Sequence, residues 1–560
     1  MRFLGIAFLF VSLFSSAALA MPVDVSNPVA DFLRRLEEKG VVPIGFWSTL
    51  PRDESEVAAV LKQAEQKESS LNSWDRRRLE HYLDEFDPER KKHGTKLHYE
   101  DSSFMLHGEV EYFTGGYSVD SITERDNKES DAYAFGSFAP TIEATYGRFT
   151  YLTTSAFVGM ERSVPARFPV DNYDPQNGLP YNVANMGINN SDQHVSTFDG
   201  FRMVGGAGNS NIHLEIGQDW NEWGPGHWQH TTLSDHPYFW DSDSLAADSA
   251  VGFYGGGQRP LVYPGSYRRG YEYPGQGPPM PQIRFRVGSD HWDYVKIIAQ
   301  TMGINDSFST LFAQRLSAHF GSFRFGASEL LAFGRPSIPL TAYLPAVPLL
   351  FAEHEGAGET GNAALSADAE WIWTGHGRLY GELYVDDFNG FPLDRWNDKF
   401  ASVLGASWQD AFGLPSEIHM EYAFVDPWVY EHYENDEQLQ NYGSLLGSML
   451  PPNSQGVFAS VGFPLPKAID GLLEWDFRQR DLKSAGSSIF DVHGTSSDIM
   501  QFLAKDVETR NQITLSMDWS WKRFVQLKAG AGWLWVETWE GNPVENLSTP
   551  SVFGEVTLKY

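Results

Sequence analysis

The segment from Gly217 to His230 concentrates side chains of the types that bind sugars. It interleaves three tryptophans with carboxylates, an amide and histidines. Aromatic faces stack on the apolar face of a sugar ring, while carboxylates and amides hydrogen-bond its hydroxyl groups. The segment therefore predicts a carbohydrate-binding site made of Asp219, Trp220, Glu222, Trp223, His227 and Trp228.

A structural interpretation of the same segment competes with this one. Gly224, Pro225 and Gly226 are residues that form tight turns, so the tryptophans around them would pack in the wall of the fold instead of meeting a ligand. Loops of this composition are often structural, and we keep both interpretations.

The histidines and acids nearby could be metal ligands. His227, His230, Asp235 and His236 are ligand types, but polar loop histidines are commoner than metal ligands. Two acidic stretches faintly suggest calcium loops without the EF-hand spacing. They contain Asp171, Asp174 and Asn177 in one case and Asp241 and Asp243 in the other. We expect no metal and no cofactor.

Enzymatic motifs are missing from the sequence. The pair Asp386 and Asp387 could serve glycoside hydrolysis, but a solvated strand end is the commoner origin of one such pair. No serine nucleophile elbow, phosphate-binding loop or zinc motif occurs. We therefore expect no catalytic residues and a protein that is not an enzyme.

The elements that would position these residues are strands. From about Lys96 onward apolar and polar residues alternate, in segments long enough to cross a membrane when tilted. Counted as single strands or hairpins they give sixteen to twenty strands, and we expect about eighteen. The segments are Leu106 to Tyr117, Ala132 to Tyr146, Arg148 to Met160, Phe198 to Ile216, Gln282 to Thr301, Gln314 to Phe333, Ala363 to Phe388, Phe400 to Phe424, Gly456 to Phe477 and Asn511 to Val536.

The connections between these segments alternate in length. Short turns are expected at Tyr146 to Arg148 and Thr374 to Gly377, and long loops at Asp120 to Asp131, Glu161 to His194, Ser234 to Pro281 and Arg335 to Gly361. The last strand, Ser551 to Tyr560, ends on an aromatic residue that suits a membrane interface. The sequence thus predicts an all-β membrane barrel, antiparallel, with long extracellular loops over residues 96–560. A soluble sandwich or propeller is the alternative.

The N-terminal part reads differently. Residues 1–20 have a basic start, an apolar run and an Ala-Leu-Ala cleavage site, which predicts a secretory signal peptide. Residues 21–95 predict a periplasmic α-helical segment with three amphipathic helices, starting near Asn27, Asp53 and Asn72. The run from Asp75 to Arg78 is expected to face solvent.

Composition agrees with export and a barrel. The 560 residues include no cysteine, and their 18 Trp, 24 Tyr, 38 Phe and 52 Gly suit aromatic girdles and tight turns. With 42 basic and 73 acidic residues the net charge is −31, which argues against nucleic acid or an anionic surface as a partner.

Several motifs follow one another along the chain: Leu50-Pro51-Arg52 before the second helix, Gly217 to His227 with Leu233-Ser234, the strand Leu379 to Phe388, Asp426 to Tyr430, and Leu446-Gly447 through Pro452-Asn453-Ser454. In this order they resemble the capsule assembly protein Wzi family of Gram-negative outer membranes. The resemblance spans nearly the whole chain after residue 20.

The resemblance implies a monomeric barrel of about eighteen strands, with a periplasmic helical bundle, that acts as a surface lectin. Its partners would be capsular polysaccharide or exopolysaccharide and outer-membrane lipid. A diffusion channel or porin for small solutes is the alternative function, and a barrel enzyme such as a lipid hydrolase is the third. An open polar lumen would separate the channel from the lectin.

Overall fold

The computed structural model describes most of the chain after residue 20. The described residues are 21–25, 27–92, 97–101, 104–122, 128–147, 149–163, 189–191, 194–209, 211–234, 279–302, 308–334, 338–353, 361–388, 396–441, 444–488, 493, 499–521, 524–538 and 546–560. The predicted signal peptide lies outside them and stays a prediction.

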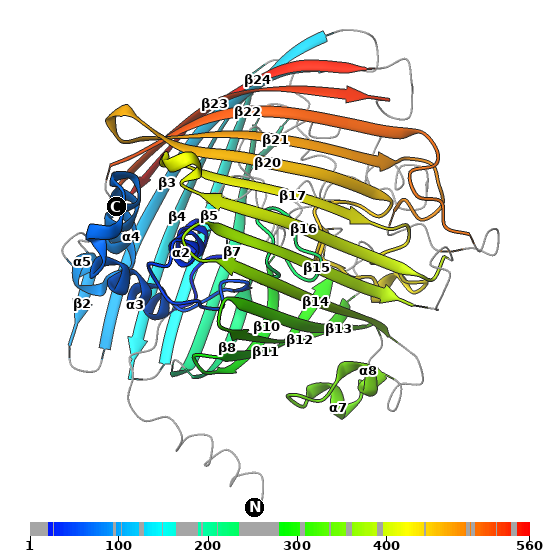
Figure 1. Ribbon diagram of the computed structural model, residues 1–560, viewed down its shortest axis with the longest axis horizontal. Coiled ribbons are helices and arrows are strands. Elements are labelled where there is room, and N and C mark those ends of the chain that lie inside the picture. The colour runs from blue at the N-terminus through cyan, green and yellow to red at the C-terminus, as the bar shows by residue number, and fades with distance from the viewer. Residues whose placement is uncertain are drawn as a thin grey trace, which may run out of the picture.

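Antiparallel strands close into one barrel of eighteen long strands (Figure 1). They are β3 (Phe104–Ile122), β4 (Lys128–Tyr146), β5 (Phe149–Ser163), β7 (His194–Asn209), β8 (Ile212–Asp219), β10 (Met280–Gly288), β11 (Trp292–Met302), β12 (Phe308–Phe320), β13 (Phe323–Phe333), β14 (Asn362–Trp373), β15 (Gly377–Asp387), β16 (Lys399–Gln409), β17 (Glu417–Val425), β20 (Ser454–Leu465), β21 (Ile469–Asp481), β22 (Val507–Trp521), β23 (Val525–Glu537) and β24 (Leu547–Lys559). The last strand, β24, pairs with the first, β3, over a register from Ser551 opposite Val119 to Lys559 opposite Glu111. The predicted fold class is confirmed.

Six short strands complete the sheet inventory of the described residues. β2 (Leu97–Glu100) extends the barrel beside β3, and β6 (Asn189–Ser191) pairs with β7. β1 (Thr49–Leu50) pairs with β9 (Glu222–Trp223), and β18 (Gln440–Asn441) pairs with β19 (Ser444–Leu445). The last two pairs lie apart from the barrel sheet.

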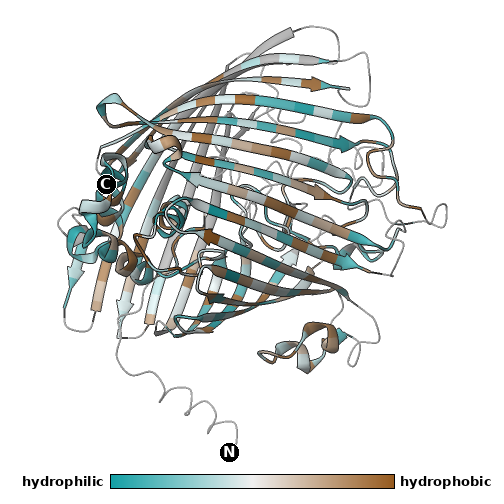
Figure 2. Cartoon of the chain, in the orientation of Figure 1, coloured by the Kyte–Doolittle hydropathy of each residue, from teal (hydrophilic) through white to brown (hydrophobic). Residues whose placement is uncertain are grey.

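The strands alternate because their two faces meet different surroundings. In β14 the side chains of Ser366, Asp368 and Glu370 are buried, whereas Leu365 and Trp371 are exposed. Teal and brown residues accordingly alternate along many strands in Figure 2. An apolar outer face with a polar inner face is the arrangement that suits a barrel in lipid. It also explains why a period of two predicted these strands.

The two ends of the barrel differ in their connections. Tight turns join β4 to β5, β12 to β13 and β14 to β15, where Gly147, Gly321 and Gly375 have positive φ. Longer connections join strands at the opposite end. The long loop expected over Asp120 to Asp131 is wrong, because β3 and β4 continue pairing as far as Ile122 opposite Lys128.

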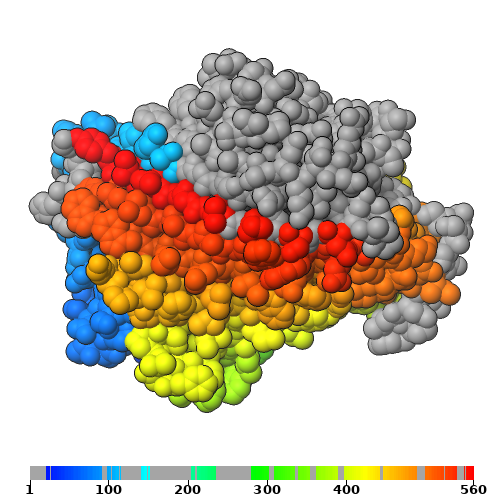
Figure 3. Space-filling model, turned by 90° about the horizontal axis from the view of Figure 1, so that it is seen from above, coloured from blue at the N-terminus to red at the C-terminus, as the bar shows by residue number. Residues whose placement is uncertain are grey.

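The expected helices form at the short-turn end. They are α2 (Val29–Glu38), α3 (Glu54–Glu65), α4 (Ser73–Phe86) and the short α5 (Pro88–Lys92). The first three pack around one apolar core, to which they contribute Phe32, Leu61 and Leu83 respectively. Figure 1 places them beside the C-terminus, and Figure 3 shows the blue N-terminal segment at one end of the molecule. No helix of the described residues is long and apolar enough to cross a membrane.

Two more short helices, α7 (Leu340–Tyr343) and α8 (Leu349–Ala352), follow β13 within the expected long loop. Single 3₁₀ turns occur at Glu68–Ser70, Ala411–Gly413, Asn435–Glu437 and Pro466–Ala468. The assignment of residues 21–95 to the periplasm and of the loops to the outside stays a prediction.

Candidate functional site

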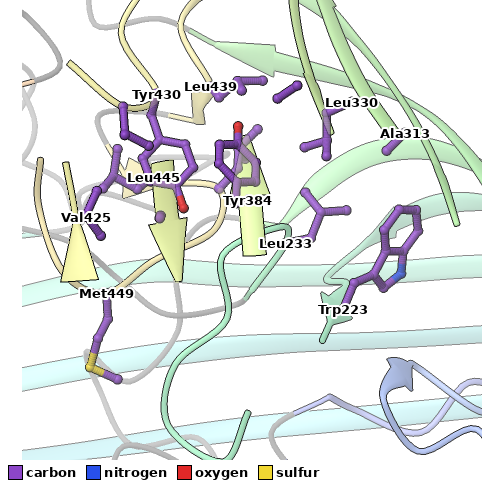
Figure 4. Packing of buried hydrophobic residues seen from close by; sticks show 14 of the residues in the cluster. Trp223, Leu233, Ala313, Leu330, Tyr384, Val425, Tyr430, Leu439, Leu445 and Met449 are labelled. Carbon is purple, nitrogen blue, oxygen red and sulfur yellow. The ribbon is translucent and has the colours of Figure 1, made fainter. Parts of the chain in front are cut away.

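Residues 220–234, here called the lumenal segment, leave the end of β8 and fold back inside the barrel. Every side chain of the segment is buried except those of His227 and Ser234, which are half-buried. Trp223 is 0% exposed and packs in one apolar cluster with inward-facing residues of the wall. Figure 4 shows Trp223 and Leu233 in this cluster, together with Tyr384 and Tyr430. The predicted sugar-binding segment is therefore part of the barrel interior.

A single carboxylate of the wall binds the turn of this segment. Glu421, on β17, accepts hydrogen bonds from the backbone N–H groups of Trp228 at 3.0 Å and Gln229 at 3.1 Å, and also from that of His227. The hydroxyl of Tyr380 donates to the same carboxylate at 2.7 Å. Consecutive N–H groups that converge on one anion form a concave site for negative charge. Here the site is filled by the protein's own Glu421.

The Gly-Pro-Gly turn is structural in a specific sense. Gly224 has a φ of +127°, and a Cβ atom there would lie 2.4 Å from Oε2 of Glu382. Glu382, on β15, also accepts a hydrogen bond from Oγ1 of Thr232 at 2.7 Å. A side chain at position 224 would thus be strained by the backbone and blocked by the wall.

Further polar contacts hold the start of the segment against β10 and to itself. Arg284, on β10, contacts the carboxylate of Asp219 at 3.3 Å and donates to Oδ1 of Asn221 at 3.2 Å. The amide of Asn221 donates to Gln282 at 2.7 Å. Glu222 lies 3.4 Å from Nε2 of His230. Because buried polar groups are costly unless paired, these contacts stabilise one conformation of the segment.

A second loop, residues 426–453, packs against the lumenal segment from the long-loop end. The hydroxyl of Tyr430 donates to the carbonyl of Thr231 at 2.7 Å, and the N–H of Ser234 donates to the carbonyl of Leu446 at 2.6 Å. Apolar residues of this loop join the same cluster: Val429, Leu439, Leu445, Met449 and Leu450.

The acid pair on β15 also serves this loop. Asp386 is buried and accepts the backbone N–H of Tyr430 at 2.7 Å, so the expectation of a solvated strand end is wrong for this residue. Asp387 is exposed and lies 3.1 Å from Nζ of Lys399. One acid of the pair therefore holds a loop and the other faces outward, which explains the pair without an acid–base role.

From the short-turn end, α2 closes the barrel mouth through buried ion pairs. Glu37 accepts a hydrogen bond from Arg324 at 2.8 Å, and Glu38 lies 3.1 Å from Arg378. Beyond α2, Arg52 binds Asp293 of β11 at 2.8 Å. The polar inner wall thus provides partners for the buried charges of Glu37, Glu38 and Arg52.

The N-terminal segment and the lumenal segment are directly joined. Leu50 pairs with Glu222 and Thr49 with Trp223 in the two-stranded β1–β9 sheet, and Gly224 N–H donates to the carbonyl of Ser48 at 2.9 Å. The expectation that Asp75 faces solvent is wrong, because it is 0% exposed and pairs with Arg35 at 2.7 Å. The N-terminal segment and the 426–453 loop thus both contact the lumenal segment inside the barrel.

Acid should loosen the contact between α2 and the β16–β17 turn. Asp410 receives Lys39 and Arg35 at 2.5 and 2.7 Å. Partial burial works to raise the pKa of Asp410, but the hydrogen bond from Lys39 and the charge of Arg35 lower this pKa overall. A lowered pKa stabilises the fold above the unfolded value of about 3.9, and this stabilisation is lost as pH falls through the folded value.

We therefore expect the Asp410→Asn variant to lose less unfolding free energy than the parent when pH falls from about 6 to about 3. Urea titrations of the folded barrel in lipid vesicles at each pH measure this difference. Parallel pH curves for parent and variant would contradict the role of Asp410.

One group of described residues has the side chains of a metal site. Asp53, His213 and Glu215 place one ligand atom each within 4.8 Å of one another. Arg286 lies 3.9 Å from Asp53, and Arg284 contacts Glu215 directly. Two guanidinium groups beside the acids disfavour a cation, so the set fits an ion-pair cluster between the N-terminal segment and the wall.

The other candidate metal ligands do not converge among the described residues. His227 stacks on His419 with ring centroids 4.0 Å apart, and His230 faces Glu222. The remaining ones lie outside the described residues: Asp171, Asp174, Asn177, Asp235, His236, Asp241 and Asp243.

Five of the six predicted carbohydrate ligands lie in the lumenal segment, and Asp219 ends β8 directly before it. All of them are buried except His227, which is half-buried. Their role in sugar binding stays a prediction. Sequence reasoning missed the residues that hold them: Glu382, Glu421, Arg284 and Tyr430. The sequence does contain a signal for such residues: polar or charged side chains recur at every second position of a strand, as in Glu417, His419 and Glu421.

The closed barrel with an apolar outer face and a filled interior defines an outer-membrane β-barrel protein. No protein-family model matches the chain, and no curated protein sequence matches it. Among solved structures it is similar to Wzi of Escherichia coli, described as an outer-membrane protein involved in group 1 capsule assembly and a carbohydrate-binding β-barrel. The TM-score is 0.54 with 13% sequence identity, over 97% of this chain and 99% of that one.

Two further similarities are weaker. OccAB1 of Acinetobacter baumannii matches 81% of this chain and 96% of its own, with 8% identity and a TM-score of 0.41. OccK2 of Pseudomonas aeruginosa matches 81% and 98%, with 9% identity and a TM-score of 0.39. At 13% identity the likeness to Wzi shows the fold alone, that of a Wzi-like outer-membrane barrel.

Proposed function

We propose that this protein binds capsular polysaccharide or exopolysaccharide and retains it at the cell surface, acting by binding and not by catalysis. The proposal is supported by the likeness to a barrel described as carbohydrate-binding and involved in capsule assembly, which extends over 97% of the chain. The motifs from Leu50 to Ser454 that resemble the same family add to this support.

The filled lumen is the observation that carries the proposal against the channel alternative. Described residues enter the barrel from both ends: α2 with Glu37 and Glu38 at one end, and the 426–453 loop with Tyr430 at the other. Between them Trp223 has no exposed surface. A diffusion pore needs a polar, water-filled path, and buried aromatic and aliphatic side chains oppose one.

A long polymer would meet this protein at the long-loop end, where the 426–453 loop contacts the lumenal segment that carries most of the predicted ligands. Its repeating units would engage many copies in the membrane at once, so weak contacts suffice at each copy. The six residues Asp219, Trp220, Glu222, Trp223, His227 and Trp228 remain our predicted carbohydrate ligands. The loops above them, which the lumenal segment supports through Thr231 and Ser234, are the neighbouring candidates.

Loss of the protein should leave polymer synthesis unchanged but release polymer into the medium. A deletion strain and a strain complemented with the parent gene would be compared for total and cell-attached polysaccharide. We expect equal totals with a lower attached fraction in the deletion. Equal attached fractions in the two strains would refute retention.

The channel alternative has its own measurement. We expect the purified, folded barrel to produce little conductance in planar lipid bilayers, because the N-terminal and lumenal segments fill it. A variant that lacks residues 21–92 but still migrates as a folded barrel tests the contribution of the helices. Large, stable steps from the intact protein would favour a porin and contradict the proposal.

A further inference from the structure

A cluster of polar side chains lies on the outer face of the barrel, where lipid is expected. Lys296, Gln314 and Glu329 are direct neighbours in the register of β11, β12 and β13. The next residues in the same register are apolar: Phe285 on one side and Leu365 on the other. This polar row therefore interrupts the apolar belt, although charged groups on a lipid-facing wall are destabilising.

Residues 338–353, here called the outer strap, cover the polar row. Nζ of Lys296 donates to the carbonyl of Leu344 at 2.7 Å, and the amide of Gln314 donates to the carbonyl of Val347 at 2.9 Å. In the other direction Glu329 accepts the N–H of Leu349 at 2.8 Å. The polar row and the strap backbone thus satisfy one another, and Lys296 is only 3% exposed.

Apolar contacts continue this attachment. Ala342, Leu349 and Ala352 of the strap pack on Phe312 and Leu331, which are outward-facing residues of β12 and β13. Figure 1 shows α7 and α8 outside the barrel, beside β13. The strap is consequently bound to the outer wall and does not enter the lumen.

The opposite side of the strap is strongly apolar. Its large exposed side chains are Leu340, Tyr343, Leu344, Leu350 and Phe351, and Leu340 is 83% exposed. This surface continues the apolar outer face of the wall, because Leu316 and Phe325 are exposed on the same two strands nearer the short-turn end. A surface of this kind is stable only when something apolar covers it.

We propose that the outer strap is inserted in the lipid bilayer, where its exposed side chains contact lipid acyl chains in the half of the membrane nearest the long loops. The position follows from connectivity. The strap follows β13, which ends at the long-loop end of the barrel. The hydrogen bonds from the strap to the wall reach Gln314 and Glu329, near the middle of their strands. Lipid is the covering that continues directly from the bare wall around Leu316.

The sequence contains no cysteine, so a single introduced thiol can be labelled without background. Phe351→Cys and, independently, Leu344→Cys would carry a nitroxide spin label in vesicles of phosphatidylcholine. Accessibility to oxygen, which partitions into lipid, would be compared with accessibility to a water-soluble nickel chelate. Leu316→Cys on the bare wall and Ser69→Cys, at the exposed polar turn between α3 and α4, are the matched lipid and water controls. Heat-modifiable migration verifies folding of each variant.

We expect both strap labels to give a high oxygen-to-nickel accessibility ratio, equal to that of the Leu316 label and above that of the Ser69 label. A ratio equal to that of the Ser69 label would place the strap in water and overturn the inference. Low accessibility to both oxygen and the nickel chelate would also overturn the inference, because it would mean that a second protein copy, and not lipid, covers the strap.

Discussion

Replacement of Trp223 by Ala is expected to lower the unfolding free energy by about 3–5 kcal/mol, the usual cost of removing a buried tryptophan from a packed core. Trp223 is 0% exposed and belongs to both the lumenal segment and the β1–β9 sheet. The substitution should therefore leave a cavity and weaken the attachment of the N-terminal segment. Urea titration in lipid vesicles, followed by heat-modifiable migration, measures the loss.

Trp373→Ala is the matched control, because Trp373 is on β14 and 58% exposed at the outer surface. We expect a clearly smaller loss there. Equal losses for the two variants would contradict the structural role of Trp223. The polymer assay adds the functional question: a Trp223→Ala, Trp228→Ala double variant that folds but sheds polymer supports sugar binding by the segment. A folded double variant that retains polymer would remove these two residues from the site.

Arg315→Met is expected to cost about 3–5 kcal/mol, because it leaves a buried carboxylate without its cation. Arg315 on β12 binds both oxygens of Asp368 at 2.6 and 3.0 Å, and both side chains are 0% exposed. Nε of Arg315 also donates to Oγ1 of Thr49 at 2.9 Å. The variant should therefore weaken the wall and the N-terminal segment together.

Lys483→Met is the control for loss of a positive charge. Lys483 pairs with Asp506, but the two side chains are 58% and 38% exposed, and exposed pairs contribute at most about 1 kcal/mol. The Arg315→Met, Asp368→Leu double variant should recover part of the loss, because no unpaired charge remains. A double variant no more stable than Arg315→Met would contradict the explanation.

Local patterns predicted the wall and the helices because both depend on local periodicity. The strand around Leu379 alternates every second residue, and the helix with Phe32, Leu33 and Leu36 repeats its apolar face at helical spacing. The barrel and its approximate strand number follow from such patterns. The closing pair β3–β24 joins the two ends of the alternating region, and nothing local in either strand identifies its partner.

The interior was harder to predict because its polar partners are far apart in sequence. Asp75 and Asp386 resemble surface acids in sequence, yet each is buried beside a partner supplied by another element. The strap was missed for a related reason. Lys296 and Glu329 break the outward apolar pattern, and only the register of three strands shows that they form one row.

The order in which the chain assembles is constrained by the β1–β9 sheet. Thr49 and Leu50 precede the first wall strand, yet they pair with Trp223 and Glu222 inside the finished wall. The seam between β3 and β24 pairs the first and the last of the eighteen long strands described, so it cannot form until all the strands between them have been made. The N-terminal segment and the lumenal segment can thus pair while the wall is still an open sheet. A route that closed the seam first would have to thread the lumenal body through a completed ring, a step that polypeptide folds avoid.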